Sequence, residues 1–317
     1  MSQLTSPQNS LTSGGHVEVS KPRTDRYVRY IRVINLAAVT IPLLGFIGAI
    51  LYMWGSGINW LYLGLLVGMY MVTGLGITIG YHRLFTHRAF DAPRAVKAVL
   101  AAMGGMAFEG PLLRWVAQHR CHHQHSDEHD DPHSPHLRGG EFMEMVRGLW
   151  HAHVGWLFTP DSPKLGRYVK DIRSDPMLRT ISNLFPLWAL IGLLIPTVLG
   201  GVLTMSWTGA LLGFLWGGLA RIFLVHHVTW SINSVCHFWG TRPFETGDES
   251  RNNAIFGALG FGEGWHNNHH AFPTSARHGL KWWQVDMSYW IIRCLEIVGL
   301  AYNVRLPTQH AMEAKRR

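Results

Sequence analysis

The sequence predicts an all-α membrane protein with four transmembrane helices in two hairpins and a helical cytoplasmic cap. Its composition is the first reason, because 47% of the 317 residues are hydrophobic and only 15% are charged, which is unusual for a soluble protein. The second reason is that residues 33–54, 55–81 and 180–220 contain no charged side chain. At about 20 residues per crossing, these stretches provide four spans. The third is the grouping of the 20 histidines beside the predicted span ends.

The first hairpin is predicted over residues 33–81, with a tight external turn at GSGIN, residues 55–59. Basic residues flank the hairpin, namely Lys21, Arg23, Arg26, Arg29 and Arg32 before it and Arg83, Arg88, Arg94 and Lys97 after it. Because cytoplasmic loops are enriched in Lys and Arg, both termini and residues 82–180 are expected to be cytoplasmic.

The second hairpin is predicted over residues 181–230, with its external turn near residues 200–207. Arg221 lies at the edge of this apolar region. A charge there is costly and often functional, but an arginine can also extend its guanidinium to the membrane surface. The sequence leaves both interpretations open.

The rest of the chain is divided by composition. Residues 1–25 are predicted to be a disordered cytoplasmic tail, because the first 20 are rich in Ser, Thr, Gln and Gly. Residues 26–306 are expected to form a single integral-membrane domain, followed by a basic cytoplasmic tail over 307–317. The apolar stretch 287–304 contains Arg293 and Glu296, which favours an amphipathic surface helix over a fifth span.

Charge and cysteine content narrow the range of partners. The net charge of +8 is suited to anionic lipid headgroups or an acidic protein donor. No basic motif interleaved with aromatic residues indicates nucleic-acid binding. Three cysteines on the predicted cytoplasmic side indicate reduced thiols and no disulfide framework.

The histidines with the most regular spacing form four groups. Positions i, i+3 and i+4 share one face of an α-helix, so HRCHH and HNNHH each direct three imidazoles the same way. In NSVCH, Asn233 and His237 have an i, i+4 relation. In HRLFTH, positions i and i+5 diverge by about 140° on a regular helix, so either the helix ends there or its turn is distorted. The group members are His82, His87, His119, His122, His123, His237, His266, His269 and His270.

Nine imidazoles at a common depth indicate a catalytic metal site. Neutral imidazole suits iron, copper, nickel and zinc, and nine ligands are more than one ion takes. Two metals with four or five nitrogens each is the simplest arrangement. The zinc signatures H-E-x-x-H and paired C-x-x-C are absent from the sequence.

Other polar side chains near these groups are assigned supporting roles. A metal-bound imidazole usually donates its second N–H to a carboxylate, and the candidates are Asp127, Glu128, Asp130, Asp131 and Glu263, although each could also be a solvated acid. Histidines 125, 129, 133 and 136 are expected on the surface or behind the ligands. Histidines 151, 153, 226 and 227 are expected to pack or to line a substrate path.

These motifs resemble the membrane fatty-acid desaturases of the Δ9 branch, over about residues 30–305. The resemblance is carried by GYHRLFTHRAF, HRCHHQHSDEHDDPH, WSINSVCHFWG, GEGWHNNHHAFP and SARHGLKWWQVD. It implies that the nine histidines bind two irons and that Asn233 reaches one of them through water. The likeness is greatest to the bacterial and plastid-type enzymes, many of which act on glycerolipids. Acyl-CoA enzymes have an arginine where this chain has Ala117, although Arg114 and Arg120 lie close enough in sequence to compensate.

The resemblance also implies an activity. The expected reaction is O2-dependent insertion of a cis double bond between carbons 9 and 10 of a saturated acyl chain, carried on glycerolipid or CoA. Selection of one methylene pair requires a closed apolar tunnel, and Trp115, Trp230, Trp265 and Phe238 are candidates to shape it. The sequence has neither H-P-G-G nor a G-x-G-x-x-G after a predicted strand. Electrons are therefore expected from a separate ferredoxin or cytochrome-type donor with its reductase, at a bacterial inner membrane.

Two rival functions remain at this stage. A hydroxylase or related oxygenase could use the same iron ligands. A divalent-metal transporter could also be rich in histidine, but transport should place ionisable residues at mid-membrane, and the predicted spans contain none.

Overall fold

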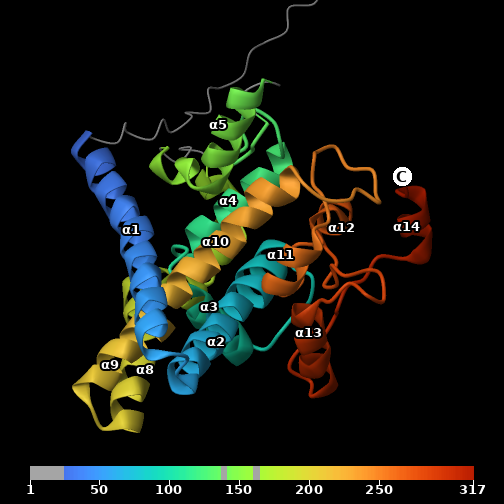
Figure 1. Ribbon diagram of the computed structural model, residues 1–317. Helices are drawn as coiled ribbons and strands as arrows, with labels where there is room; N and C mark the ends of the chain where they lie inside the picture. Colours follow the sequence, from blue (N-terminus) through green and yellow to red (C-terminus); the bar gives the residue numbers. More distant parts are fainter. Residues whose placement is uncertain (1–24, 137–140, 160–164) are drawn as a thin grey trace, which may run out of the picture.

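The computed structural model describes residues 25–136, 141–159 and 165–317 (Figure 1). These residues form helices joined by loops, with a few isolated β-bridges and no strand. The predicted all-α class is confirmed. Of the predicted N-terminal tail, all but Asp25 lies outside the described residues.

Within the described residues, four helices are long and apolar enough to cross a membrane. Two of them combine several helical segments without a break in direction. The first candidate span is Arg29–Ser56 within α1 (Asp25–Ser56), and the second is Trp60–Thr86, made of α2 (Trp60–Leu75) and the π-helix η1 (Gly76–Thr86). The third is α8 (Phe185–Thr204). The fourth is Trp207–His237, made of α9 (Trp207–Gly213), the π-helix η4 (Phe214–Ala220), α10 (Arg221–Ser234) and the 3₁₀ turn η5 (Val235–His237).

Short turns join the first span to the second and the third span to the fourth, which is consistent with the predicted hairpins. Gly57 has φ +76° in the first turn, and the Asn59 side chain accepts a hydrogen bond from the Leu61 N–H to cap α2. In the second turn the Ser206 hydroxyl caps α9 by accepting the Gly209 N–H. Both turns lie at the lower left of Figure 1, at the ends of the spans away from α4 and α12.

Small residues set how closely the spans pack. A Cβ on Gly200 would lie 2.3 Å from the Gly209 carbonyl oxygen, so α8 and α9 approach backbone to backbone. A Cβ on Gly45 would lie 2.3 Å from Leu219, which places α1 against η4. The first two spans therefore both pack on the fourth span, and they diverge from each other in Figure 1.

Arg221 is completely buried, so the interpretation in which it extends to the membrane surface is wrong. Its guanidinium donates hydrogen bonds to the carbonyl oxygens of Met106, Gly192 and Gly217, at 2.8, 2.8 and 3.2 Å. A buried charge is tolerated when its donors are satisfied. Arg221 therefore joins α8, η4 and the loop after α3.

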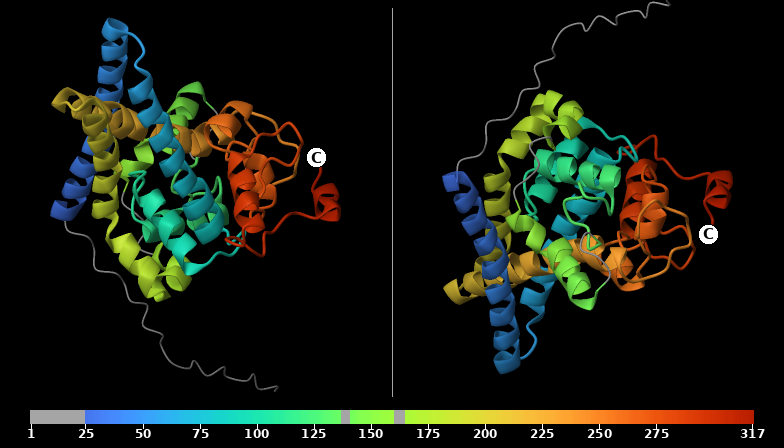
Figure 2. Two further views of the ribbon diagram at one scale, coloured as in Figure 1. Left: turned by 90° about the horizontal axis from the view of Figure 1, so that it is seen from below. Right: turned by 90° about the horizontal axis from the view of Figure 1, so that it is seen from above.

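The remaining helices form the cap. Figure 2 shows α12, α13 and α14 together on one side of the spans. The cap elements are α3 (Arg94–Gly105), α4 (Leu112–His125), α5 (Phe142–His153), η2 (Gly155–Phe158), η3 (Leu165–Val169), α6 (Lys170–Ser174), α7 (Pro176–Asn183), α11 (Ala254–Leu259), α12 (His266–Ala271), α13 (Met287–Ile297) and α14 (Gln309–Ala314).

The main core lies where η1 meets the cap. Tyr81 and Leu84 of η1 pack in one buried cluster with Leu112 and Val116 of α4 and Ile292 of α13. The 11-residue α13 is too short to span a membrane. It buries Ile292 and exposes Trp290, as expected for an amphipathic helix.

The segment 307–317 differs from the predicted basic tail. It contains α14, and its residues 315–317 pair with residues 243–245. Ala311 and Met312 pack on a small apolar cluster formed by Phe244, Ala271 and Phe272. The sequence shows the basic residues of this segment, but it does not show the apolar surface that receives α14.

Candidate metal centre

The first histidine pair lies at a π-helix. The His87 N–H donates to the His82 carbonyl oxygen at 3.1 Å, an i to i+5 bond, and the two ring centroids are 4.8 Å apart. The distorted turn is therefore the correct one of the two alternatives, and it brings residues five apart onto one face. Such π segments are frequent at functional sites. Gly76 and Gly80 of η1 approach α3 too closely for larger side chains.

The other groups lie on elements that converge from separate parts of the chain. His119, His122 and His123 are on α4, as the i, i+3, i+4 spacing predicts. The HNNHH group occupies α12. His237 ends the fourth span in η5.

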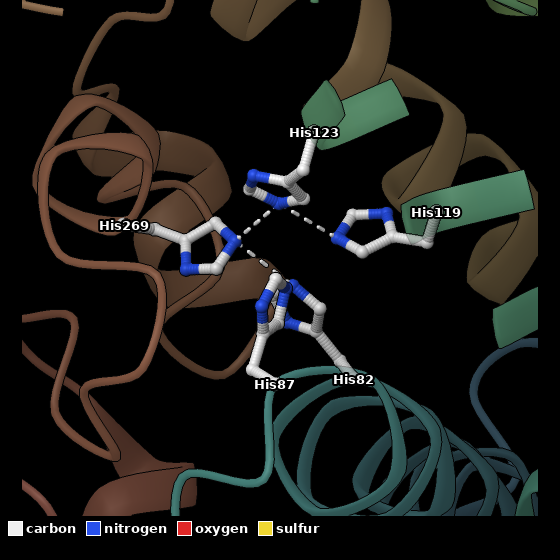
Figure 3. Close-up of side chains that lie close together, drawn as sticks. All are labelled: His82, His87, His119, His123 and His269. Atoms are coloured by element: carbon white, nitrogen blue, oxygen red, sulfur yellow. Dashed lines mark hydrogen bonds between the residues drawn. The ribbon is translucent and has the colours of Figure 1, made fainter. Parts of the chain in front are cut away.

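Five imidazoles meet in the first cluster, which we call the five-histidine group: His82, His87, His119, His123 and His269. Their ligand atoms all lie within 4.8 Å of one another. Figure 3 shows the rings pointing toward a common centre from η1, α4 and α12. Contacts between Nε2 atoms are 3.1 Å for His82 and His269, 2.9 Å for His269 and His123, and 3.1 Å for His123 and His119.

Four imidazoles meet in the second cluster, the four-histidine group: His122, His237, His266 and His270. The Nε2 atoms of His237 and His266 are 3.0 Å apart. His122 and His123 are adjacent on α4, and so are His269 and His270 on α12, so each helix contributes to both groups. All nine predicted ligands therefore fall into two sets of five and four.

The protonation of these rings fits metal binding. A ring nitrogen has either one N–H or one in-plane lone pair, so Nε2 of His269 cannot hydrogen-bond to both His82 and His123. The Nδ1 atoms of His82 and His237 face carboxylates, which leaves lone pairs on their Nε2 atoms. Nε2 of His122 and of His270 is buried without a hydrogen-bond partner. Lone pairs directed at a shared centre are what a metal ion requires.

Burial favours the neutral form of five of the ligand rings, whereas Asp131 raises the pKa of a sixth, His122. Burial lowers the pKa of His87, His119, His123, His266 and His269 well below the usual histidine value, and the neighbouring histidines lower it further. Neutral imidazole is the form that binds metals.

Three of the five acids expected to support the ligands each contact a ligand histidine. Glu263 lies 2.6 Å from Nδ1 of His82, Asp131 2.9 Å from Nδ1 of His122, and Asp127 2.9 Å from Nδ1 of His237. Burial alone would raise the pKa of Asp127 and of Asp131, but the adjacent histidines lower both below the usual range. Glu128 and Asp130 are exposed.

The sequence reasoning missed a fourth carboxylate. Asp248 lies 2.6 Å from Nδ1 of His270. It belongs to the loop between η5 and α11, which has no regular spacing relative to α12. The only available signal was the acidic pair in TGDES, residues 246–250.

A buried charged network supports the five-histidine group. Arg83 is fully buried and contacts Glu263 at 3.2 Å and Asp286 at 2.9 Å. His278 is also fully buried and lies 3.3 Å from Glu263. Burial alone would raise the pKa of Glu263, but His82, His278 and Arg83 lower it well below its usual value.

The histidines outside the groups have varied positions. His133 is buried, and burial next to His122 lowers its pKa to about 3. His136 contacts the His237 carbonyl oxygen at 2.8 Å, whereas His129 is fully exposed. His153 and His227 contact each other at 2.9 Å.

An apolar cavity of about 520 Å³ runs from α1 to the five-histidine group. Its volume is in the usual range for small-molecule sites, about 300–1,000 Å³. Trp115 and Trp230 line it, as do His119, His226 and Asn233. A smaller cavity continues from Asn233 to His82 and His266.

Two of the aromatic residues predicted for the tunnel lie elsewhere. Trp265 is not among the lining residues of either cavity. Its ring is buried and its indole N–H donates to the Val285 carbonyl oxygen at 2.7 Å. Phe238 does not line the cavities either, and 39% of its surface is exposed.

One carboxyl group, that of Glu109, faces the apolar cavity, and no motif or spacing indicates it in the sequence. Glu109 accepts hydrogen bonds from the Trp115 indole N–H at 2.9 Å and from the Thr229 hydroxyl at 2.7 Å. Burial raises the pKa of Glu109 to about 7, and the two hydrogen bonds oppose this shift only in part.

Comparison with known proteins places this site in a family. The fatty acid desaturase family model matches residues 58–302, which include every predicted ligand. The chain belongs to the fatty acid desaturase family. Three relatives illustrate the activities found among similar proteins. They are a hex-5-enoyl-[acyl-carrier protein] acetylenase from Moorena producens (43% identity, 94% of each chain), an sn-1 stearoyl-lipid 9-desaturase from Anabaena variabilis (40%, 82% of this chain and 90% of the relative), and an icosanoyl-CoA 5-desaturase from Limnanthes douglasii (40%, 74% and 62%).

Proposed function

We propose that this desaturase uses O2 and two irons to insert a cis double bond between carbons 9 and 10 of a saturated acyl chain. The observation that carries the proposal is the meeting of nine imidazoles in two groups at the end of an apolar cavity. The sn-1 stearoyl-lipid 9-desaturase among the relatives supports the position of the double bond.

The two histidine groups fit the two irons. The five-histidine group would hold one ion and the four-histidine group the other, with Asn233 reaching one of them through water. Bound iron with O2 supplies the oxidising power that an unactivated C–H bond demands. In the overall reaction two hydrogens leave adjacent methylenes, two electrons come from an external donor with two protons, and O2 is reduced to two waters.

The residues around the cavity position the acyl chain and surround it with mostly apolar side chains. The cavity wall, which includes Trp115, Trp230 and Ile222, is mostly apolar and would hold an acyl chain between η1, α4 and α10. Because a displacement near 1 Å can cost about a hundredfold in rate, the depth at which the chain stops selects the methylene pair. Thr229 and Glu109, joined by a hydrogen bond, form one of several polar points on this wall.

A glycerolipid is the carrier that the cavity favours. Ile34, Ala38 and Ile41 of α1 line the cavity, and α1 exposes Val33, Leu36 and Leu44 on its outer side. A substrate that lies in the bilayer would therefore need to pass only α1. CoA is less favoured, because Ala117 replaces the expected arginine.

Arg120 does not supply the missing phosphate contact. Its guanidinium donates to Asp171 at 2.8 Å and to the carbonyl oxygens of Phe85, Thr86 and Tyr168. Arg114 lines the cavity and is the remaining cationic candidate. The names of the relatives include lipid, CoA and acyl-carrier-protein substrates, so the carrier needs a direct test.

The electron donor is proposed to be a separate ferredoxin or cytochrome-type protein with its reductase. The cap and both described ends of the chain lie on the side of the spans opposite the two turns. We assign this side to the cytoplasm of a bacterial inner membrane, because basic residues flank the spans there. The net charge of +8 suits an acidic donor.

A second activity has a specific observation in its favour. The relative with 43% identity is a hex-5-enoyl-[acyl-carrier protein] acetylenase, which implies that a closely similar site removes two hydrogens from an alkene. A hydroxylase with the same ligands would instead insert oxygen. Metal transport is disfavoured, because the buried charge Arg221 is fixed by three carbonyl oxygens and lines neither cavity.

The test is expression in a host without its own desaturase, with gas chromatography of the fatty acids and location of the new bond by mass spectrometry. A Δ9 alkene in glycerolipids supports the proposal. An alkyne from an added enoic acid moves the assignment to the acetylenase, and an alcohol moves it to the hydroxylase. Lipid, CoA and acyl-carrier-protein substrates supplied to membranes with a donor identify the carrier.

A further inference from the structure

One loop supports half of the four-histidine group. In the segment 244–250, the Asp248 carboxylate contacts Nδ1 of His270 at 2.6 Å. The next backbone N–H, that of Glu249, donates at 2.8 Å to the same Asp127 oxygen that contacts His237. The position of this loop therefore sets the orientation of two of the four imidazoles.

The loop is held from the inside by α12. The Phe244 N–H donates to the side-chain oxygen of Asn267 at 2.9 Å, and the Asn267 amide donates back to the Phe244 carbonyl oxygen at 3.1 Å. Asn267 is fully buried. It is the neighbour of His266, so the loop is tied directly to the helix that carries three ligands.

The loop is held from the outside by the segment 309–317. The Glu245 N–H donates to the Lys315 carbonyl oxygen at 2.8 Å, and the Arg317 N–H donates to the Pro243 carbonyl oxygen at 3.0 Å. The Lys315 ammonium donates to the carbonyl oxygen of Ala271, the last residue of α12, at 2.7 Å. The segment thus bridges the loop and the ligand helix.

Apolar packing fixes the same segment. Met312 and Ala311 of α14 pack on Phe244, Ala271 and Phe272, where the Lys315 ammonium lies 5.5 Å from the Phe272 ring centroid. Without the segment 309–317, the outer backbone groups of Pro243 and Glu245 lose their partners and the apolar cluster becomes exposed to water.

We infer that residues 309–317 form a clasp that positions Asp248 and Asp127 on the four-histidine group and retains the iron there. The clasp touches no metal ligand and no substrate cavity, so it is a positioning element. The inference rests on the proposed function, because it assigns a role toward the second iron. Groups that orient ligands typically change metal affinity by about 10-fold to 100-fold.

The experiment compares iron content and iron loss in the full-length protein purified in detergent. Wild type is expected to contain about two irons per chain, and deletion of residues 309–317 should leave about one. The Met312→Asp variant places a charge in the apolar cluster and should lose one iron to a ferrous chelator about tenfold faster than wild type. Met312→Leu restores the apolar contact and should behave like wild type.

The matched control is His310→Ala, which changes an exposed side chain of the same helix. Mössbauer spectra of ⁵⁷Fe-loaded samples should show that the clasp variants lose one of two iron signals and keep the other unchanged. Helix content by circular dichroism should stay at the wild-type level. A merely structural role would weaken both signals together.

Two results would overturn the inference in different ways. If wild type holds two irons and both the deletion and Met312→Asp keep them with wild-type kinetics, the clasp has no role and the proposed function stands. If wild type holds no iron under conditions where it folds, the proposed function fails and the inference fails with it.

Discussion

Both histidine groups of the metal centre consist of imidazoles, but different residues support the imidazoles in each group. The five-histidine group is backed by Glu263, Arg83 and Asp286, which are buried between η1, α12 and the start of α13. The four-histidine group is backed by Asp127, Asp131 and Asp248, which come from loops.

This difference shows which parts of the protein hold the ligands in place in each histidine group. In the five-histidine group, the network that orients the ligands is also part of the protein core, so a change there affects folding and metal binding together. In the four-histidine group, loops and α14 do the orienting, so metal binding can weaken while the fold persists. The experiments below separate these two expectations.

The largest effect is expected from removing a ligand of the five-histidine group. His269→Ala should abolish the unsaturated product and lower the iron content, because its Nε2 lies within 3.1 Å of both His82 and His123. His129→Ala is the control, because it changes a fully exposed ring a few residues after HRCHH. It should leave the product at the wild-type level. Gas chromatography and metal analysis check both, and product from His269→Ala would show that the ring is not a ligand.

A stability difference is expected between the two sets of supporting carboxylates. Glu263→Gln leaves Arg83 with one acid fewer in a fully buried site, and breaking a buried ion pair typically costs about 3–5 kcal/mol. Asp248→Asn changes a partly exposed loop residue, keeps an oxygen acceptor for Ser250 and should cost about 1–2 kcal/mol. Thermal unfolding in detergent measures both, and equal losses would contradict the proposed division between core and loop.

The same two variants should differ in the opposite sense when iron retention is measured at a temperature where both are folded. Asp248→Asn should speed the loss of one iron by about tenfold, because His270 loses a charged partner. If Asp248→Asn lost iron selectively from the five-histidine group, the proposed difference between the two groups would be wrong.

A pH effect of moderate size is expected from Glu109. Its pKa of about 7 means that the carboxyl is neutral below pH 7 and charged above it. A charge beside an apolar acyl chain is unfavourable, so the KM for substrate should rise as the pH increases through 7. Glu109→Gln keeps the shape without the charge and should flatten this dependence, as steady-state kinetics from pH 6 to 8.5 would reveal.

The raised pKa of Glu109 should also make the folded protein less stable as the pH increases. Because its pKa is raised by folding, the unfolded chain ionises first, and the free energy of unfolding should fall between about pH 4.5 and 7 and then level off. The Glu109→Gln variant should lack this component. An unchanged pH slope in the variant would mean that Glu109 is not the group responsible.

Much of the fold and of the ligand set could be predicted from local sequence. The spans follow from uncharged stretches of sufficient length, and the α4 and α12 groups follow from i, i+3, i+4 spacing. These features depend only on neighbours along the chain. For the same reason, the three supporting acids near the second and third groups could be named.

The features that could not be predicted depend on contacts between distant segments. The π-helix at His82 and His87 arises where Gly76 and Gly80 pack on α3. Asp248 reaches His270, which is 22 residues further along the chain and separated from it by α11. Arg221 finds its three carbonyl oxygens only after α8 and η4 come together, and α14 finds its apolar surface only after α12 has folded.

The most direct measurement is anomalous X-ray diffraction at the iron edge on crystals of the iron-loaded protein. The account predicts two peaks, one enclosed by the five-histidine group and the other by the four-histidine group, at the end of the apolar cavity. A single peak, a peak away from both groups, or an absorption edge belonging to zinc would contradict it.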